Sequence, residues 1–529
     1  MSARPWWQTG VFYQVYPRSL QDSNGDGVGD LPGITSRLDY LAGLGVETLW
    51  LSPIFRSPMA DFGYDVSDYE DIDPLFGTLA DFDALLAEAH RRGLRVILDF
   101  VPNHTSTAHR WFQEARQSRD NPKRDWYIWA DPKPDGSPPN NWLSYFGGPA
   151  WTFDAATGQF YLNNFDPSQA DLNWRNPAVK QAMFDALRFW LRRGVDGFRV
   201  DVIAAMLKDP ALRDNPLDPN WKPGDNPIWR VRRVYSEQAP GIHELIAEMR
   251  AVIDEFPDRM MVGEIPYTTD PALQVSFFGT QDKPEAHQPF NFAFIMLPWT
   301  APVVRDFIAR YNAAVPAWGW PTYVLGNHDQ DRLVTRIGAE QARVAALFLL
   351  TVRGAPYIWQ GEELGLPNGE VAPEDFQDPQ GINLGISRDL CRTPFHWNGG
   401  PNTGFTTGKP WLPIASTYRT LNVEAEDVDP RSSLTLYRRL LALRRAHPAL
   451  HEGTMTLLET PLPVIAWLRE QGDERFLTLL NLSDEAHLVS HSTLGSGEIV
   501  LSTALDREGM ADLASITLRP NEGVLVKLG

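Results

Sequence analysis

The sequence predicts an α/β fold: a (β/α)₈ TIM barrel with an inserted subdomain after the third strand and a C-terminal antiparallel β-sandwich. Helical patterns that stop at glycine alternate with short apolar runs along most of the chain. Because buried parallel strands are apolar on both faces and are joined by helices, this alternation favours a closed barrel. One stretch rich in Trp, Pro, Asn and Gly interrupts the alternation, and the last part of the chain has only short strand patterns.

The composition is that of a globular protein and excludes several classes of partner. The chain has 529 residues, 43% hydrophobic and 22% charged, so a large buried core is expected. The net charge of −19 disfavours nucleic acid and anionic lipid. The longest apolar run, Val344 to Val352, is too short to cross a membrane. With one cysteine and no signal-peptide pattern, the sequence predicts a cytoplasmic protein, and it leaves the oligomeric state open.

The first helix–strand unit begins in TLADFDALLAEAHRRG. A helical stripe that ends at Gly93 predicts a helix there, and the apolar run LRVILDF predicts a strand that ends near Asp99. The stripe consists of Leu79, Phe82, Leu85, Leu86 and Ala89.

The second unit has clear helix boundaries. Asn176 is the expected N-cap, Pro177 occupies the first helical position and Gly194 is the stop. The strand VDGFRVD follows and places Arg199 and Asp201 at its end.

Two further strands also end in charged residues. The helix HELIAEMRAVIDEF leads to MMVGEI and Glu264, and the strand TYVLG leads to Asn327, His328 and Asp329. Active sites of (β/α)₈ barrels lie at the C-terminal ends of the strands. The charged residues are therefore expected at one mouth of the barrel.

The alternation stops between Asn103 and Leu172, where the sequence includes DWYIWADPKPDGSPPNNWLSYFGG. This stretch is too long for an ordinary connection and is predicted to be a small domain that shapes a pocket above the barrel. From about Gly453 onward, runs such as RFLTLLNL predict the β-sandwich. The predicted units are the barrel, residues 1–103 and 173–450; the inserted subdomain B, residues 104–172; and the C-terminal domain, residues 451–529.

The loop DSNGDGVGD, residues 22–30, has oxygen-bearing side chains at alternate positions, as loops that bind hard cations do. An EF-hand loop counted from Asp22 would need a bidentate Glu at its twelfth position, which is Gly33. The pattern thus favours a bound divalent ion but argues against a two-helix calcium sensor of the EF-hand type. A turn that binds nothing is the alternative. The candidate ligands are Asp22, Asn24, Asp26, the Val28 carbonyl and Asp30.

Several carboxylates are predicted at the barrel mouth. Converging carboxylates are electrostatically costly, but retaining glycoside hydrolysis needs one as nucleophile and another as proton donor. A zinc site is the rival, although His104 and His328 do not have the spacing of common zinc motifs. Scattered salt bridges would explain any one of these acids, but explain the whole set poorly. The strand-end acids are Asp99, Asp201, Glu264 and Asp329.

The segments DFVPNH, GFRVD, VGEI and LGNHD resemble, in order, the four conserved blocks of the α-amylase family, glycoside hydrolase family 13. The stretches VFYQVYPRSLQDSNGDGVGDLPGI, FGYDVSDY, APYIWQGEELG and RDLCRTPFHWN resemble the oligo-1,6-glucosidase and α-glucosidase branch of that family. The resemblance implies a retaining exo-acting α-glucosidase that acts on short oligosaccharides or disaccharides.

The resemblance also implies residue roles. Asp201 matches the nucleophile, Glu264 the general acid/base and Asp329 the carboxylate that holds the ring hydroxyls of the distorted sugar. Arg199 matches the arginine that keeps the nucleophile ionised. Further matches for sugar binding are Tyr64, Asp65, His104, His328, Phe146, Phe165 and Arg392, with Arg388 as the competitor of Arg392.

For the loop of residues 22–30, the resemblance implies a structural Ca²⁺ or Mg²⁺ remote from the reaction, and no organic cofactor. Val202, which follows the nucleophile, implies activity on α-1,6 bonds, because valine accompanies that linkage in this branch.

Other members of the fold offer alternatives. Non-catalytic ancillary chains of amino-acid transporters share it, but they have a membrane anchor and lack the acids. Sucrose isomerases and transglucosylases have the same acids and differ in what attacks the glucosyl-enzyme. The stretch QDRLVTRIG, after Asp329, does not resemble the arginine-rich signature of sucrose isomerases.

Overall fold

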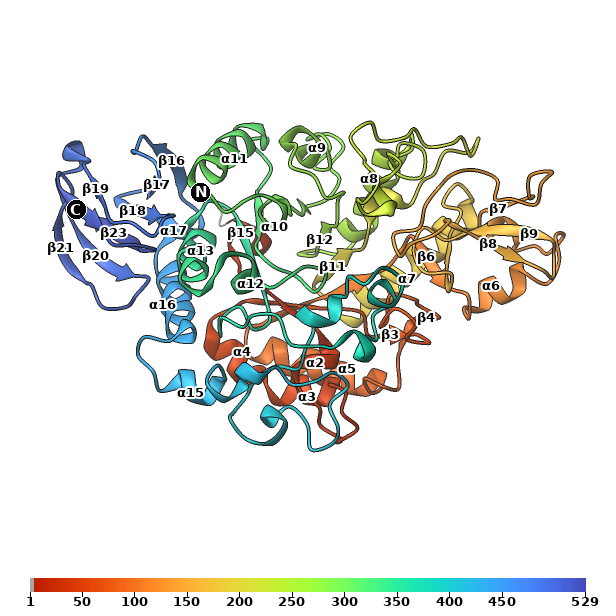
Figure 1. Cartoon of the computed structure of the whole chain (residues 1–529), viewed down its shortest axis with the longest axis horizontal. Helices are drawn as coiled ribbons and strands as arrows, with labels where there is room; N and C mark the ends of the chain where they lie inside the picture. Colours follow the sequence, from red (N-terminus) through yellow and green to blue (C-terminus); the bar gives the residue numbers. More distant parts are fainter. Residues whose placement is uncertain (1–3) are drawn as a thin grey trace.

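The computed structural model describes residues 4–529. Its centre is a sheet of eight parallel strands in the order β13-β12-β11-β5-β2-β1-β15-β14, surrounded by helices (Figure 1). The predicted barrel is confirmed. The strands are β1 (Phe12–Val15), β2 (Thr48–Leu51), β5 (Arg95–Phe100), β11 (Gly197–Val200), β12 (Met260–Gly263), β13 (Gln288–Pro289), β14 (Thr322–Val324) and β15 (Ala355–Trp359).

The ring closes between β13 and β14 through a side chain. The Thr322 hydroxyl donates a hydrogen bond to the carbonyl of Pro289 (2.8 Å) and accepts one from the amide of Asn291 (3.0 Å). Pro289 has no N–H group to offer to a strand ladder. One hydroxyl therefore joins two strands that the ordered sheet leaves unpaired.

Each strand is followed by at least one helix on the outside of the barrel. The predicted caps are present: Asn176 accepts a hydrogen bond from Ala178, and Gly194 has the left-handed conformation that ends α7. The helices that follow the strands are α3 (Leu31–Ser36), α4 (Leu38–Leu44), α5 (Leu79–Arg91), α7 (Pro177–Arg193), α8 (Ile242–Asp254), α9 (Pro271–Ser276), α11 (Ala301–Ala314), α13 (Ala339–Thr351) and α16 (Ser433–Ala446).

Shorter elements lie at the N-terminus and in the connections. They are α1 (Trp6–Thr9), α2 (Pro17–Leu20), β3 (Phe55–Arg56), β4 (Asp68–Ile72), α10 (Ala293–Met296), α12 (Leu333–Ile337), α14 (Pro379–Leu384), α15 (Val423–Asp427) and α17 (Pro448–His451). Within residues 4–529, no helix combines the length and the apolar character that crossing a membrane requires.

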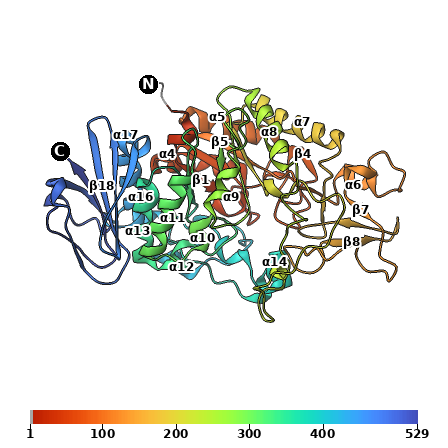
Figure 2. The same cartoon turned by 90° about the horizontal axis from the view of Figure 1, so that it is seen from above.

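The inserted subdomain follows β5, the third strand of the barrel, as predicted, and extends to one side of it (Figure 2). Its two ends pair with each other as β6 and β10, and β7, β9 and β8 form a separate sheet with its own aromatic core. Its elements are β6 (His104–Ser106), α6 (Arg110–Ala115), β7 (Trp129–Ala130), β8 (Trp151–Asp154), β9 (Gln159–Leu162) and β10 (Gln169–Asp171).

Two other connections are long and were not predicted. Residues 201–241 join β11 to α8, and residues 360–432 join β15 to α16. Both contribute side chains to the cavity described below.

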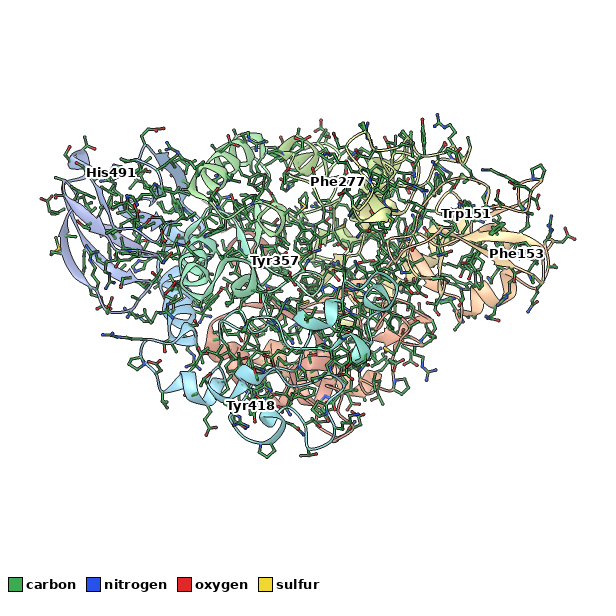
Figure 3. The ribbon with its side chains drawn as sticks, viewed as in Figure 1. Trp151, Phe153, Phe277, Tyr357, Tyr418 and His491 are labelled. Atoms are coloured by element: carbon green, nitrogen blue, oxygen red, sulfur yellow. The ribbon has the colours of Figure 1, made fainter. Side chains whose placement is uncertain are left out.

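The C-terminal domain lies at the opposite end of the molecule from the inserted subdomain, as the labelled His491 and Trp151 show (Figure 3). It has an antiparallel sheet in the order β16-β17-β18-β23-β20-β21 and a second antiparallel pair, β19-β22, which confirms the predicted architecture. The strands are β16 (Thr454–Leu458), β17 (Val464–Gln471), β18 (Glu474–Asn481), β19 (His487–Val489), β20 (Ser496–Ser502), β21 (Gly509–Asp512), β22 (Ile516–Leu518) and β23 (Gly523–Leu528).

Candidate active site

A cavity of about 610 Å³ lies at the C-terminal ends of the barrel strands, beside the inserted subdomain. This is the end at which barrel enzymes place their chemistry. It brings together most of the residues predicted from the sequence. Those that line it are Tyr64, His104, Phe146, Phe165, Asp201, Glu264, His328 and Asp329.

Arg199 is the centre of a buried group of carboxylates. It lies opposite Asp99 in the register of β11 and β5, and Asp201 follows two residues later, on the same side of the strand. Its Nη1 atom is 2.7 Å from Asp99 Oδ1 and 2.7 Å from Asp201 Oδ1, and its Nη2 atom contacts Glu264 Oε2. One guanidinium thus faces three carboxyl groups.

Burial and excess negative charge shift the pKa values of this group. Burial raises the pKa of Asp99 to about 6, against the opposing effect of Arg199. Burial, and then the nearby Glu264 and Asp99, raise the pKa of Asp201 well above its ordinary value, again against Arg199. Because the carboxyl groups interact strongly, they titrate as a group rather than one by one.

Tyr64 and His328 stack with ring centroids 5.4 Å apart and connect Asp99 to the cavity wall. The Gln14 amide donates to His328 Nδ1 (2.7 Å), which leaves the imidazole proton on Nε2, where it faces the Tyr64 hydroxyl at 2.6 Å. The Tyr64 hydroxyl in turn donates to Asp99 (3.0 Å). Burial lowers the pKa of His328 well below its usual value, although the charge of Asp329 opposes the shift.

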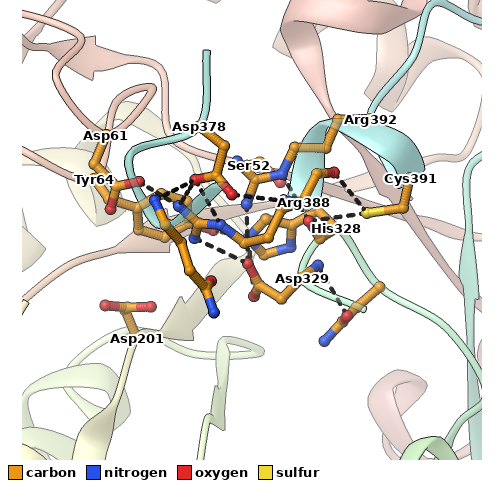
Figure 4. A network of polar contacts seen from close by, with 12 residues as sticks. Ser52, Asp61, Tyr64, Asp201, His328, Asp329, Asp378, Arg388, Cys391 and Arg392 are labelled. Carbon is orange, nitrogen blue, oxygen red and sulfur yellow. Dashed lines mark hydrogen bonds and ion pairs between the residues drawn. The ribbon is translucent and has the colours of Figure 1, made fainter. Parts of the chain in front are cut away.

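Asp329 lies between two arginines, as Figure 4 shows. Its Oδ1 atom is 2.9 Å from Arg392 Nη2 and 3.3 Å from Arg388 Nη1. Burial alone would raise its pKa, but His328, Arg388 and Arg392 together lower it below the usual range. Asp329 is therefore a carboxylate, able to accept hydrogen bonds from hydroxyl groups.

Asp65, which the sequence predicted to bind sugar, is not among the residues that line the cavity. Its carboxylate is fully buried and accepts hydrogen bonds from the Ser57 hydroxyl (2.8 Å) and from the amides of Ala60 and Asp61 (3.0 Å each). Asp65 therefore stabilises the turn that contains Asp61, and Asp61 lines the cavity. Burial raises the pKa of Asp61 to about 6, although Arg388 opposes the shift.

Of the two arginines that the sequence left in competition, Arg388 lines the cavity and Arg392 does not. Arg392 is 0% exposed, and its Nε atom donates to the carbonyl of His328 (2.7 Å). Arg388 extends over Phe146, 5.0 Å from its ring centroid, and its Nη2 atom is 2.7 Å from Asp61 and 2.6 Å from Asp378. Arg392 reaches the cavity through its contact with Asp329.

Several cavity residues were missed by sequence reasoning. Most of them come from irregular segments with no helix or strand period, and the exceptions lie in very short elements such as β10 and α14, so no pattern distinguishes them from other loop residues. They are Asp61, Tyr145, Gln169, Ile228, Trp229, Val231, Arg233, Glu237, Tyr267 and Gln380.

The loop of residues 22–30 lies outside the cavity, and Asp22 links it to a distant part of the chain. The Asp22 carboxylate accepts hydrogen bonds from the amides of Gly25 and Gly27 (2.8 Å each) and from the Thr406 hydroxyl. The loop thereby connects the region after β1 with the long connection after β15.

The other candidate ligands of this loop also bond within it. Asp26 accepts from the amide of Val28 (2.8 Å), and Asp30 caps α3 by accepting from the amide of Gly33 (2.6 Å). In the part of the chain that the structure describes, no group of three or more His, Cys, Asp or Glu side chains is placed to hold a metal. An ion here would therefore depend on the Asn24 side chain and the Val28 carbonyl as well as on the carboxylates.

Comparison with known proteins agrees with this geometry. The family described as alpha amylase, catalytic domain, matches residues 14–453. A probable alpha-glucosidase of Rhizobium meliloti (strain 1021) is 46% identical over 499 residues, which cover 91% of this chain and 90% of that protein. An oligo-1,6-glucosidase of Parageobacillus thermoglucosidasius is 38% identical, with 99% of each chain covered.

Among solved structures, the crystal structure of the alpha-glucosyl transfer enzyme XgtA superposes with a TM-score of 0.94 and 43% identity over 100% of both chains. The similarity therefore extends through the inserted subdomain and the C-terminal domain. On these grounds, the chain belongs to the α-amylase family, glycoside hydrolase family 13, and to its oligo-1,6-glucosidase and α-glucosidase branch.

Proposed function

We propose that this chain is a retaining, exo-acting α-glucosidase that hydrolyses terminal α-1,6 or α-1,4 glucosidic bonds of short oligosaccharides or disaccharides. The observation that carries the proposal is the contact of Arg199 with three carboxyl groups at one cavity, two of which, Asp201 and Glu264, are accessible from it. Exo action is supported by the pairing of Arg388 with Asp61 over Phe146, which gives one end of the cavity a polar wall.

Double displacement assigns each group a step. Asp201 attacks the anomeric carbon while Glu264 gives its proton to the leaving oxygen, so that one C–O bond forms as another breaks. Glu264, now a carboxylate, then takes a proton from water, whose oxygen displaces Asp201 and releases glucose. Asp329 accepts hydrogen bonds from ring hydroxyls throughout and favours the positively charged transition state.

The configuration of the first product tests this proposal. Two displacements return the anomeric carbon to its original configuration, so proton NMR of fresh hydrolysate should show α-glucose before mutarotation. If β-glucose appears first, a single displacement operates and the proposal is wrong.

Transfer of glucose to another sugar is the second candidate, because the similar XgtA is named as an alpha-glucosyl transfer enzyme. The two activities share the glucosyl-enzyme and differ only in the acceptor. Incubation with sucrose and with maltose, followed by product mass and linkage analysis, separates them. Products that are mostly trisaccharides favour transfer, and products that are mostly sucrose isomers favour the sucrose isomerase alternative.

We further propose that α-1,6 bonds are good substrates, because Val202 lines the cavity directly after Asp201. Val202 has φ +34° and ψ +48°, and its amide donates to Glu264 Oε2 (3.2 Å). A β-branched residue in this left-handed region is strained, and the hydrogen bond of its amide holds Val202 next to the proton donor.

The expected result is that kcat/KM for isomaltose at least equals that for maltose. Val202→Thr should shift the ratio toward maltose by about tenfold, the scale of a methyl or hydroxyl change in such a site. If the unaltered enzyme prefers maltose a hundredfold, the valine argument fails.

We also propose that Asp22, Asn24, Asp26, the Val28 carbonyl and Asp30 hold a structural Ca²⁺ or Mg²⁺. The alternating oxygen donors support this, and so does the linking position of the loop between two distant segments.

Removal of this ion should destabilise the protein without stopping the chemistry. An ion that binds only the folded state stabilises it by mass action, so EDTA should lower the melting temperature by a few degrees and leave initial rates at moderate temperature nearly unchanged. Elemental analysis should find one Ca or Mg per chain. The absence of both the ion and the thermal response would contradict the proposal.

A further inference from the structure

The cavity contains an acidic residue that double displacement does not use. Glu237 lies in the 201–241 connection, is 6% exposed and lines the cavity. Its Oε1 atom accepts a hydrogen bond from the Tyr145 hydroxyl (2.6 Å). None of the described residues donates to Oε2. The Oε2 atom is therefore available to accept a hydrogen bond from a molecule in the cavity that Glu237 lines.

Two neighbours fix this carboxylate in place. Arg233 is 7% exposed in its side chain and lies 3.9 Å from Glu237 Oε1, and its guanidinium lies over the Tyr145 ring, 3.6 Å from the centroid. Tyr145 stacks in turn on Phe165 at 5.1 Å. The group therefore ties the 201–241 connection to the inserted subdomain, and it orients one oxygen atom. Residue Gln238, directly after Glu237, has a positive φ of +52°, which is uncommon outside glycine and frequent at functional sites.

The position of Glu237 points to the leaving part of the substrate. The terminal glucose has its own polar groups in Asp61, Arg388 and Asp329. The connection that carries Glu237 begins with Asp201, and the amide of its next residue, Val202, donates to Glu264. Tyr145, Glu237 and Glu264, the residue that protonates the leaving oxygen, line the same cavity.

The same connection lines the cavity with both apolar and polar side chains. The apolar ones include Ile228, Trp229 and Val231, and the polar ones include Arg232 and Arg233 beside Glu237. A few well-placed polar groups among apolar ones are the usual basis of orientation and specificity in ligand sites.

We propose that Glu237 accepts a hydrogen bond from a hydroxyl of the leaving sugar, and so selects sugar leaving groups over aromatic ones. Tyr145 and Arg233 are positioning residues for it. This inference rests on the proposed glucosidase function. A carboxyl oxygen accepts hydrogen bonds in either protonation state, so the contact does not require Glu237 to be ionised.

The test compares leaving groups with and without hydroxyls. In the unaltered enzyme and in Glu237→Gln, kcat/KM is measured for isomaltose, for maltose and for p-nitrophenyl α-glucoside, whose aromatic leaving group has no hydroxyl. Glu237→Gln should lower the ratio of kcat/KM for the disaccharides to that for the aryl glucoside by about tenfold, the scale of one hydrogen bond. The amide oxygen would take the hydrogen bond from Tyr145, and the NH2 group would then replace the acceptor that faces the leaving sugar. Tyr145→Phe should lower the same ratio by a smaller factor, because the carboxylate remains but loses its anchor.

The matched control is Glu244→Gln, the same change at an exposed position of α8, and the ratio should not change there. If Glu237→Gln does not fold, Glu237→Asp withdraws the carboxylate by one methylene and should produce the same fall in the ratio. An unchanged ratio overturns the inference, and so does an equal loss on all the substrates, which would indicate a structural role. If the unaltered enzyme hydrolyses neither type of substrate, the glucosidase proposal itself is wrong, and the inference with it.

Discussion

Asp201→Asn should lower kcat for maltose and isomaltose by about 10⁴-fold or more, the scale expected when a covalent nucleophile is removed. The amide keeps the shape of the side chain but cannot form the glycosyl ester. The protein should still fold, and its melting temperature should equal or exceed that of the unaltered chain. This follows because Asp201 is one of three carboxyl groups around a single guanidinium, and removing a negative charge relieves their repulsion.

A direct observation should accompany the kinetics. A slow fluorinated glucosyl substrate should label the unaltered enzyme on Asp201, and mass spectrometry of the digest should locate the sugar there. Asp39→Asn is the control, because Asp39 lies on the surface of α4 with an 85% exposed side chain. Turnover that survives in Asp201→Asn, or a label on another carboxylate, would remove Asp201 from its assigned role.

Glu264→Gln should lower kcat for disaccharides by about 10²–10⁴-fold, the usual contribution of general acid–base catalysis. Without a proton donor, the sugar leaving group departs as an alkoxide, whereas p-nitrophenolate needs little help to leave. Bond cleavage in p-nitrophenyl α-glucoside should therefore be much less affected, and breakdown of the glucosyl-enzyme should become limiting. Azide, which attacks without a general base, should then restore turnover of the aryl glucoside.

The azide product carries the stereochemical information. Attack on the glucosyl-enzyme from the face that the leaving group vacated should give α-glucosyl azide. A β-azide would mean that azide replaces a carboxylate nucleophile, and Glu264 would then be the nucleophile rather than the acid/base. If azide does not restore turnover, and if Glu264→Gln lowers kcat equally for disaccharides and for the aryl glucoside, Glu264 has a structural role.

The barrel could be predicted because its longer helices and strands are marked by sequence signals of their own, such as caps and apolar runs. Asn176, Pro177 and Gly194 mark the ends of α7 through caps that need no tertiary information, and β5 is mostly apolar, with the sequence RVILDF. The strand β13 has only two residues, one of them Pro289, and no periodicity can identify so short an element. Its strand conformation depends on the pairing with β12.

The candidate site could be predicted where it depends on strand ends. Arg199 and Asp201 share one side of β11 because side chains alternate along a strand, and the register with β5 places Asp99 beside them. The walls depend instead on irregular segments, whose paths are set by tertiary contacts. The choice between Asp61 and Asp65 illustrates this: the two lie four residues apart, and which of them faces the cavity depends on which carboxylate the turn's own amides occupy.

The join between β13 and β14 has a mechanical consequence for the reaction. Glu264 follows β12 and Asp329 follows β14, so the span between them crosses this seam, where the Thr322 hydroxyl takes the place of a peptide ladder. Other side chains also cross the span: Asn327 donates to the Tyr267 hydroxyl and Arg336 to the carbonyl of Phe294. The distance between the two acids is therefore set at this point by side-chain hydrogen bonds, which can adjust without breaking any strand pairing.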